Sequence, residues 1–460
     1  TQVRSRINSL NLAIALAPAT VPARIDPLIS QLPQLPQSRF AAYAHIQLAQ
    51  TLNCWAIAQA SSLTPAYSVL APGPQALRSQ SLDYLQEAIA MAQDLGDRRA
   101  ESYGWGHLGR LYTDRIMTGD VAAMAEAKTV TNRAMSLAQQ LQAPDLAYRW
   151  QWQMGRLLKQ DGQTEEAIAY YAQAFNTLKQ LRSDLTVLDT DIQFSFREQI
   201  EPLYREFVAL LLRSPASTTV ATKGGTLANT SRTSTIENPA DQPSQTHLKQ
   251  ARDVLEALQL AELDNFFQDA CSDVEPASLD AIIDEQSPTS AVLYAIVLDE
   301  ELPLDEKGLD DERSSQSLNV ILKLPRDEPR NSPNNGDTEA SANLRYYSTQ
   351  VHAQAIREVV LDFRQQLIRP HTSQSLQAPA QTIYQWLIQP LEPELQAHQI
   401  DHIVFVLDGV LRNVPMAALH DGQGFVGDRY AISVSSGLQL LRRDTQADAS
   451  AQVLAAGLSE

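Results

Sequence analysis

The sequence offers few side chains whose type and spacing suit nucleophilic or metal chemistry. Its two cysteines, Cys54 and Cys271, lie far apart and form neither a metal-ligand spacing nor a disulfide framework. A thiol needs a nearby base to become a nucleophilic thiolate, and Cys271 with His402 or His420 is the pairing worth naming. Ser435 lacks the Gly-x-Ser-x-Gly context of a serine hydrolase. Because the glycines are too dispersed for a phosphate loop and no histidine pair has zinc spacing, the sequence predicts no catalytic, cofactor-binding or metal-binding residue.

Asp408 and Arg412 are the candidate pocket residues of the C-terminal half. They follow His402–Leu407, an apolar run of the length expected for a buried strand, and Asp408-Gly409 ends that strand in a turn. Because α/β folds place their sites at the carboxyl ends of strands, either side chain is in position to shape a substrate pocket. The alternative, which we favour, is that both serve the hydrogen bonding of their own loop.

This strand belongs to an alternation of helices and strands over residues 248–460. The periodic helix Leu248–Phe267 precedes two short apolar runs, which we expect to pair as a hairpin across an acidic insert. The alternation predicts an α/β sandwich with a partly parallel sheet. The other expected elements are strands at Ala291–Leu298 and Leu318–Leu324 and helices at Val351–Ile368 and Ala378–Leu395.

The N-terminal half carries apolar residues at helical spacing from about residue 38 to residue 213. In its clearest unit, Gly155, Ala167, Tyr171 and Ala174 stand at the offsets of a tetratricopeptide repeat (TPR). The small residues allow two helices to approach closely, and the tyrosine fills the gap one turn later. Asp161-Gly162 is expected to end the first helix of this unit.

A preceding unit shows the same signature. Its pitch is longer than the usual value of about 34 residues, and we expect the extra length around Gly119. A long amphipathic helix, Asp191–Arg213, which Pro202 kinks or breaks, closes the array. These features predict an all-α, TPR-like solenoid with a capping helix over residues 38–213, after an N-terminal helical segment at residues 1–37. The recurring residues, 46 positions apart, are Leu95 and Leu141, Gly109 and Gly155, and Arg110 and Arg156.

A solenoid of stacked repeats exposes a long groove, which usually holds a peptide, a partner helix or a linked domain. We therefore expect a protein or peptide partner in this groove, with Trp105, Trp150 and Trp152 as candidate lining residues. Two alternatives remain. The repeats could simply support the C-terminal domain, and the tryptophans could form inter-repeat core, which is the commoner use of aromatic residues at helical spacing.

Composition narrows the class of partner. The formal net charge of the chain is -18, which argues against nucleic acid or an anionic membrane surface. No apolar run reaches the roughly 18 residues of a membrane span, and the cysteine pattern favours the cytoplasm. Residues 214–247 predict a flexible linker, because they bury too little apolar surface to offset ordering. Residues 299–316, which are acidic, and 326–343 predict disordered inserts.

Four segments of the C-terminal half follow one another in a recognisable order. They are LEALQLAELDNFFQDAC, the strand pair ending in LKLP, YQWLIQPLEPEL, and VFVLDGVLRNVPMAALHDGQGFVGDRYAISVSSGLQLL. Together they resemble the landmarks of bacterial proteins that join TPRs to a CHAT domain, a caspase-like cysteine peptidase family. The resemblance implies an α/β caspase-like domain and peptide cleavage by a histidine and a cysteine located after the next strands. It places Cys271 at a helix end, outside the active site.

The ends of the chain suggest a piece of a longer polypeptide. The sequence begins at Thr1 and stops at Glu460, shortly after QVLAAGL, which resembles the strand before the histidine region of the family. We therefore expect only the N-terminal part of a CHAT domain over residues 248–460, with the catalytic pair beyond residue 460. The chain would then be the regulatory portion of a cysteine endopeptidase and inactive alone; the alternative is a non-catalytic TPR scaffold for protein–protein interaction in signalling.

Overall fold

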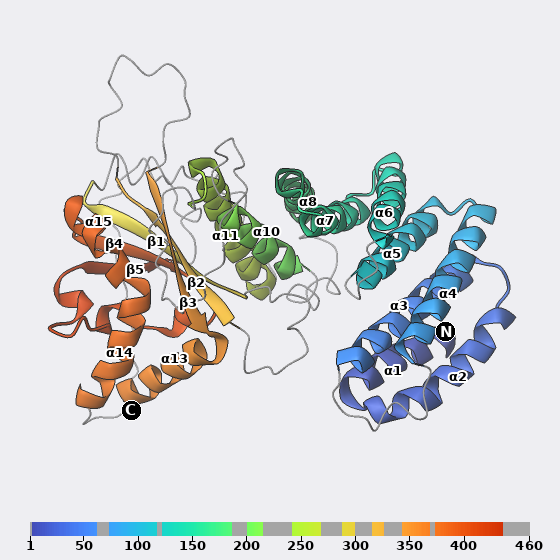
Figure 1. The fold of residues 1–460 in the computed structure, drawn as a ribbon, viewed down its shortest axis with the longest axis horizontal. Helices are drawn as coiled ribbons and strands as arrows, with labels where there is room; N and C mark the ends of the chain where they lie inside the picture. Colours follow the sequence, from blue (N-terminus) through green and yellow to red (C-terminus); the bar gives the residue numbers. More distant parts are fainter. Residues whose placement is uncertain are drawn as a thin grey trace, which may run out of the picture. The chain divides into compact units, whose positions relative to one another are not determined.

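The computed structural model divides the chain into two compact units, whose boundary falls between Leu210 and Leu211. The first unit is built from helices, and the second combines helices with a mixed sheet (Figure 1). A helical N-terminal region followed by an α/β unit is what the sequence predicted. The structure describes residues 2–61, 73–116, 122–185, 200–214, 242–267, 288–299, 315–325, 343–368 and 373–435.

The helices of the first unit pack mainly as successive pairs, α3 with α4, α5 with α6 and α7 with α8. The N-terminal helices α1 and α2 share an apolar core with α3 and α4, which includes Ile7, Ile25 and Leu48. The bounds are α1 Gln2–Leu16, α2 Val21–Gln31, α3 Arg39–Ser61, α4 Pro74–Asp94, α5 Arg98–Ile116, α6 Ala123–Gln140, α7 Pro144–Gln160, α8 Thr164–Leu185 and α10 Glu201–Arg213, with 3-10 turns at Pro18–Thr20 and Leu32–Gln34.

Three tight turns between these helices have the same geometry. Gly96, Gln142 and Gly162 each adopt a left-handed backbone conformation, with φ of 66°, 49° and 78°. In each turn the amide of the following residue donates to a carbonyl five positions earlier, at 2.9 to 3.0 Å. This is the Schellman ending of a helix, which satisfies carbonyls that the helix leaves open. The break predicted at Gly162 is confirmed, and the turn at Gly96 recurs 46 residues later, whereas the TPR assignment itself stays a prediction.

Close packing of α7 on α8 depends on the absence of a side chain at Gly155. A Cβ atom there would lie 2.7 Å from the ring of Tyr171, which is 1% exposed. Ala167 and Ala174 are fully buried on the same helix as the tyrosine. The predicted close approach at Gly155, with Tyr171 filling the space beside it, is therefore confirmed for this helix pair.

Within the described part of the chain, the array-closing helix covers Glu201–Arg213, and Pro202 is the second residue of α10. The predicted kink or break at Pro202 stays a prediction. Residues 191–199 of the predicted helix lie outside the described residues, as do residues 117–121, where the extra repeat length was expected. The predicted linker 214–247 is also too long, because α11 already begins at Gln245.

The sheet of the second unit has the order β3-β2-β1-β4-β5. β1 pairs antiparallel with β2 and β2 with β3, whereas β4 is parallel to β1 and β5 is parallel to β4. The bounds are α11 Gln245–Phe267, β1 Ser290–Asp299, β2 Ser315–Lys323, β3 Leu344–His352, α13 Ala353–Ile368, α14 Ser373–Leu387, α15 Glu392–Ala397, β4 His402–Leu407 and β5 Ala431–Ser435, with 3-10 turns at Gln389–Leu391, Gly409–Asn413, Met416–Ala418 and Val426–Asp428.

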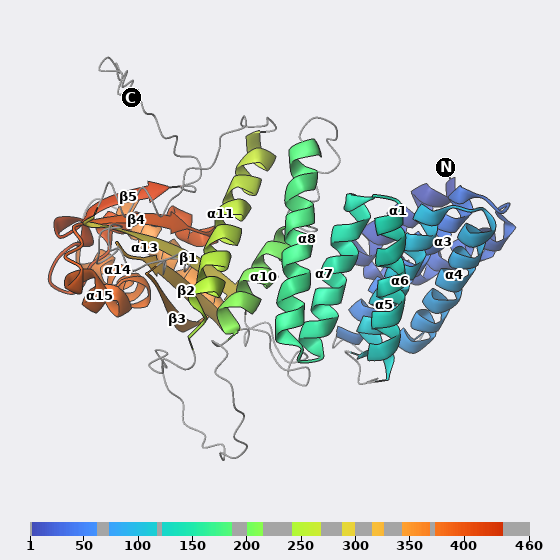
Figure 2. The ribbon, with the colours of Figure 1, turned by 90° about the horizontal axis from the view of Figure 1, so that it is seen from above.

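Helices cover both faces of this sheet (Figure 2). Leu293 and Phe405 belong to the apolar core that the sheet forms with α13 and α14. On the opposite face, the hydroxyl of Tyr294 donates to the buried carboxylate of Glu256 on α11 at 2.5 Å. Because side chains alternate along a strand, neighbouring residues of β1 reach the two layers. The predicted sandwich with a partly parallel sheet is confirmed.

Three local predictions in this unit are wrong. Residues 351–352 were assigned to a helix, but Val351 pairs with Gln316 at the end of β3. β3 itself was missed, although LRYYSTQVH is rich in the aromatic and β-branched residues that favour strands. The ends of the predicted insert 299–316 are strand residues of β1 and β2, and the predicted helix Ala378–Leu395 is interrupted by a 3-10 turn at Gln389–Leu391. β5 was not predicted.

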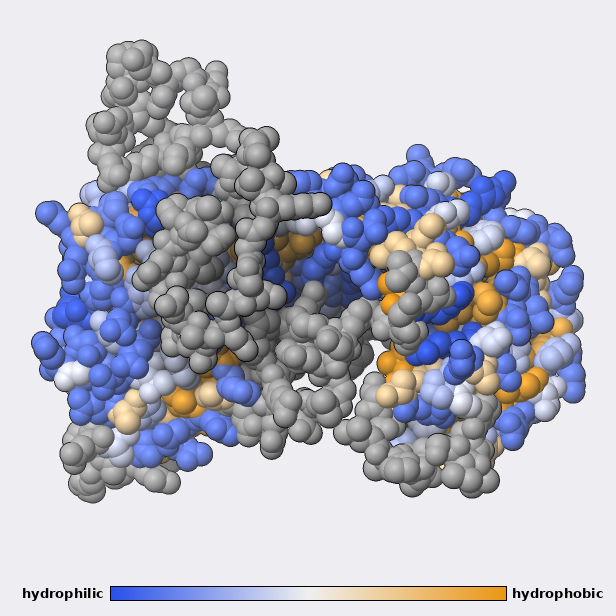
Figure 3. Space-filling model, viewed as in Figure 1, coloured by the Kyte–Doolittle hydropathy of each residue, from blue (hydrophilic) through white to orange (hydrophobic). Residues whose placement is uncertain are grey.

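The surface of the described residues is mixed in polarity. Apolar and hydrophilic side chains alternate over the face seen in Figure 3. Leu16 on α1, 75% exposed, and Phe40 on α3, 42% exposed, are two of the larger exposed apolar side chains. Among the helices that the structure describes, none has both the length and the apolar character required to cross a membrane.

Replacing Gly155 with alanine is expected to destabilise the helical unit by about 1–3 kcal/mol, the usual cost of overpacking. At an exposed helix position, replacing glycine with alanine stabilises the protein by about 1 kcal/mol. Because of the close contact with Tyr171, the same replacement at Gly155 is expected to destabilise it. Urea unfolding followed by circular dichroism measures the change. In a Tyr171→Leu background the cost of Gly155→Ala should fall by at least about half, because the ring is gone. An equal cost in both backgrounds would contradict this packing.

Candidate functional site

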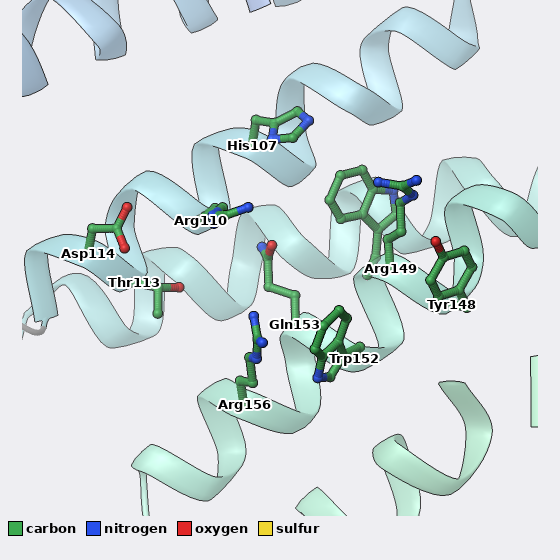
Figure 4. A pocket seen from close by; sticks show the side chains of 10 residues that line it. His107, Arg110, Thr113, Asp114, Tyr148, Arg149, Trp152, Gln153 and Arg156 are labelled. Carbon is green, nitrogen blue, oxygen red and sulfur yellow. The ribbon is translucent and has the colours of Figure 1, made fainter. Parts of the chain in front are cut away.

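The helical unit contains a groove of about 200 Å³ between α5 and α7 (Figure 4). Both helices are the first members of their pairs, so equivalent positions of successive repeats face the same space. Figure 4 shows Arg110 on α5 and Arg156 on α7 extending towards the region around Gln153. The lining residues are His107, Arg110, Thr113, Asp114, Tyr148, Arg149, Trp150, Trp152, Gln153 and Arg156.

The three predicted tryptophans occupy different places. Trp152 is half-buried and lines the groove, and Trp150 contributes to its wall although it is only 3% exposed. The indole N–H of Trp150 donates inward to Ser102 at 3.1 Å, so this ring is mainly core. Trp105 does not line the groove; it packs among apolar residues of the repeats, and its N–H donates to Glu101 at 3.3 Å. Trp152 therefore lines the groove, whereas Trp105 and Trp150 belong mainly to the inter-repeat core; that a partner binds there stays a prediction.

Glu206 on α10 is bound at the edge of the groove by three side chains. Arg156 donates to both of its carboxylate oxygens at 2.8 and 2.5 Å, and Trp152 and Tyr171 donate at 2.9 and 2.8 Å. Burial by itself would raise the pKa of Glu206, but these hydrogen bonds and the arginine charge lower it below 4.5. The Arg156 guanidinium also lies over the Trp152 ring, 3.9 Å from its centroid. One carboxylate thus holds two groove residues in place.

Arg110 and Asp114 lie one turn apart on α5. Burial raises the pKa of Asp114. The hydrogen bond from Asn53 on α3 and the charge of Arg110 lower this pKa, but by less than burial raises it. Arg110 is exposed, and it makes no hydrogen bond or ion pair with a described residue. Its guanidinium is therefore open to a ligand.

His107 adds an uncharged polar group to the same wall. Its ring stacks on Tyr103 with an interplanar angle of 7°, and its Nδ1 atom is buried without a hydrogen-bond partner. Burial, reinforced by the charges of Arg110 and Arg149, lowers the pKa of His107 to about 3. The imidazole is therefore neutral at pH 7. The groove lining contains three arginines and one aspartate, so its net charge is positive, although the formal charge of the chain is -18.

Asp408 and Arg412 are placed in the second unit, at the end of β4. Arg412 donates from Nε to the carbonyl of Leu407 at 3.0 Å and from Nη2 to Glu262 on α11. Asp408 is 4% exposed, and its amide donates to Ala295 on β1 at 3.2 Å. These contacts attach the loop to β1 and α11, and a role of the pair in a substrate pocket stays a prediction.

One known family matches this part of the chain. Residues 377–460 match the CHAT domain. The protein contains a CHAT domain. The described part of the match runs from α14 to β5 and includes the 3-10 turns that follow β4. No curated protein matches the chain.

The nucleophile and base candidates are not brought together by the described residues. Cys271 lies outside them. Within the CHAT domain, His402 is bridged through both ring nitrogens, to Ser290 and Ser433 at 2.9 Å each, and His420 accepts from the amide of Gly422 at 2.9 Å. In the described ranges there is also no cluster of three side chains able to hold a metal ion.

Sequence reasoning missed the charged residues of the groove. A signal for two of them was present, because Arg110 and Arg156 occupy equivalent positions 46 residues apart and both prove to face the groove. Glu206 gave no such signal. Its role depends on the docking of α10 beside α7 and α8, which no local pattern specifies.

Glu206→Gln is expected to lower the free energy of unfolding at pH 7 by about 1.5–3 kcal/mol, the usual contribution of hydrogen bonds to a charged group. Because the folded-state pKa of Glu206 is below 4.5, its stabilisation is present above pH 4.5 and is lost as the pH falls through the folded-state value. The difference between wild type and variant should therefore shrink below pH 4.5. Urea unfolding at several pH values measures it.

Glu166→Gln is the control for this variant. Glu166 is exposed in the first turn of α8, where its charge contributes only through the helix dipole, about 0.3–1 kcal/mol. A difference for Glu206→Gln that stayed constant down to pH 3 would show that the ionised carboxylate is not what stabilises α10.

Proposed function

We propose that the helical unit is a TPR-like module that binds a peptide or protein partner in the groove between α5 and α7. The groove itself carries the proposal, because equivalent helices of successive repeats present polar and aromatic side chains to one open space. Stacked helix pairs typically use such a face for binding. Trp152 and Arg156, held by Glu206, supply a preorganised wall that loses little entropy when a ligand binds.

The CHAT domain supports a role related to caspase-like peptidases for the second unit. In our proposal the helical unit regulates this domain by sensing its partner, and a cysteine and a histidine outside residues 1–460 carry out peptide cleavage. A bacterial cytoplasm is the proposed setting, on the same resemblance. A scaffold without catalysis is the alternative, and the binding step is common to both.

Groove binding is tested by filling the groove without changing its charge. Thr113→Trp places an indole in the lining and is expected to weaken peptide binding at least about tenfold, since a bulky group excludes the ligand. The measurement is recovery of peptides from a random-sequence pool on the immobilised protein, followed by affinity determination for the recovered peptides.

Thr129→Trp is the matched control. Both threonines donate to the carbonyl four residues earlier in a helix, at 2.9 and 2.8 Å, but Thr129 is exposed on α6 and does not line the groove. Thr129→Trp should bind as the wild type does. Equal binding by Thr113→Trp, or no peptide recovered by the wild type, would refute the proposed function.

Residues 1–460 alone are expected to cleave no peptide, because we place the catalytic pair outside them. Incubation with a peptide library, analysed by mass spectrometry, measures cleavage. Cys54→Ser and Cys271→Ser should leave the background unchanged. Cleavage that Cys271→Ser abolishes would instead establish Cys271 as a nucleophile in this chain.

A further inference from the structure

We infer that the groove between α5 and α7 selects an acidic peptide segment, whose carboxylates bind Arg110 beside His107. This inference rests on the proposed function and adds the chemistry of the ligand. Three observations carry it: a carboxylate already bound at the groove edge, an open arginine, and a buried nitrogen without a partner.

Glu206 shows which group this wall binds. Its carboxylate takes a bidentate arginine, an indole N–H and a phenol O–H, which together satisfy both oxygens. Planar guanidinium groups match carboxylates in this two-point geometry. Arg156 is therefore occupied by an internal ligand.

Arg110 occupies the position equivalent to Arg156 in the preceding repeat, but it has no described counterpart of Glu206. It is exposed and extends into the groove (Figure 4). Asp114, one turn away, accepts its hydrogen bond from Asn53 and makes none with Arg110. The positive charge of Arg110 is thus available to an incoming carboxylate.

His107 supplies the second contact. A buried polar atom without a hydrogen bond is destabilising, so Nδ1 of His107 favours a ligand that provides a partner. Because the imidazole is neutral, one ring nitrogen donates a hydrogen bond and the other accepts a hydrogen bond. A peptide offers both kinds of partner, since its amide N–H donates and its carboxylate oxygens accept. Arg110 and His107 lie on the same helix, three residues apart, and so address adjacent groups of one ligand.

The size and surface of the groove favour a peptide over other anions. About 200 Å³ accommodates one or two side chains and is below the roughly 300 Å³ at which pockets for whole small molecules begin. Single-stranded nucleic acid binds largely by stacking bases on open aromatic faces. Here Arg156 covers a face of Trp152, and Trp150 is buried. The chain charge of -18 also repels a polyanion beyond the groove.

The experiment compares three fluorescein-labelled peptides of alternating Ala and Glu, Ala and Gln, or Ala and Lys, together with a labelled oligothymidine, by fluorescence anisotropy. The Glu peptide should bind at least about tenfold more tightly than the Gln peptide, and the advantage should fall with added salt, as for a charge-assisted hydrogen bond. The Lys peptide and the oligothymidine should bind more weakly than the Glu peptide.

Arg110→Gln should remove the preference for Glu over Gln, and Arg110→Lys should restore part of it, because lysine keeps the charge but not the two-point geometry. Arg98→Gln is the matched control, since Arg98 is exposed on the same helix and lies outside the groove lining. It changes the net charge equally and should leave the preference intact. Circular dichroism checks that each variant is folded.

The outcomes separate the inference from the function on which it rests. Equal affinity for the Glu and Gln peptides, with both abolished by Thr113→Trp, would refute the acidic preference and leave groove binding intact. Oligothymidine binding as tight as that of the Glu peptide would also overturn the inference, because the groove would then take polyanions in general. If no peptide bound, including those from a random pool, both the proposed function and the inference would be refuted.

Discussion

The partly buried carboxylate of Glu206 is the contact on which the end of the helical unit depends. It joins three helices, because its donors lie on α7 and α8 while it belongs to α10. Partial removal of a carboxylate from water is costly unless its oxygens accept hydrogen bonds, and here both oxygens do. The same contact fixes the rotamers of Arg156 and Trp152, so the shape of the groove and the docking of α10 depend on one charge. The packing of the helices and the shape of the groove are therefore not separable at this position.

The α/β unit uses its two sheet faces differently. The face towards α13 and α14 is an apolar core, which tolerates small adjustments of the packed helices. The face towards α11 includes polar contacts, among them Tyr294 with Glu256 and the amide of Gln259 with the carbonyl of Leu407 at 3.2 Å. Because each buried polar group must find its own partner, such contacts specify one register of the helix on the sheet. Arg412 extends this attachment to the loop that follows β4.

Local pattern was sufficient for much of the fold. The β1–β2 pair and β4 are apolar runs of strand length. The spacing between Gly155 and Tyr171 was sufficient to predict the close contact between α7 and α8. β3 and β5 were missed for a physical reason: their burial is partial, and pairing with β2 and β4 defines them more than any periodicity of their own. The charged groove was less predictable still. The tryptophans were chosen as candidates for their residue type alone. Whether each one lines the groove or belongs to the core depends on its exposure, which is set by how successive helices stack.

The three matching turns of the helical unit differ in one respect that bears on its dynamics. Two place glycine in the left-handed conformation, whereas the turn between α6 and α7 places Gln142 there. A side chain in this conformation costs roughly 1 kcal/mol. This turn joins two successive helix pairs, and its strain lowers the free energy needed to open the chain locally between them. The turn at Gln142 is thus expected to open locally more often than the turn at Gly162, which lies within a pair.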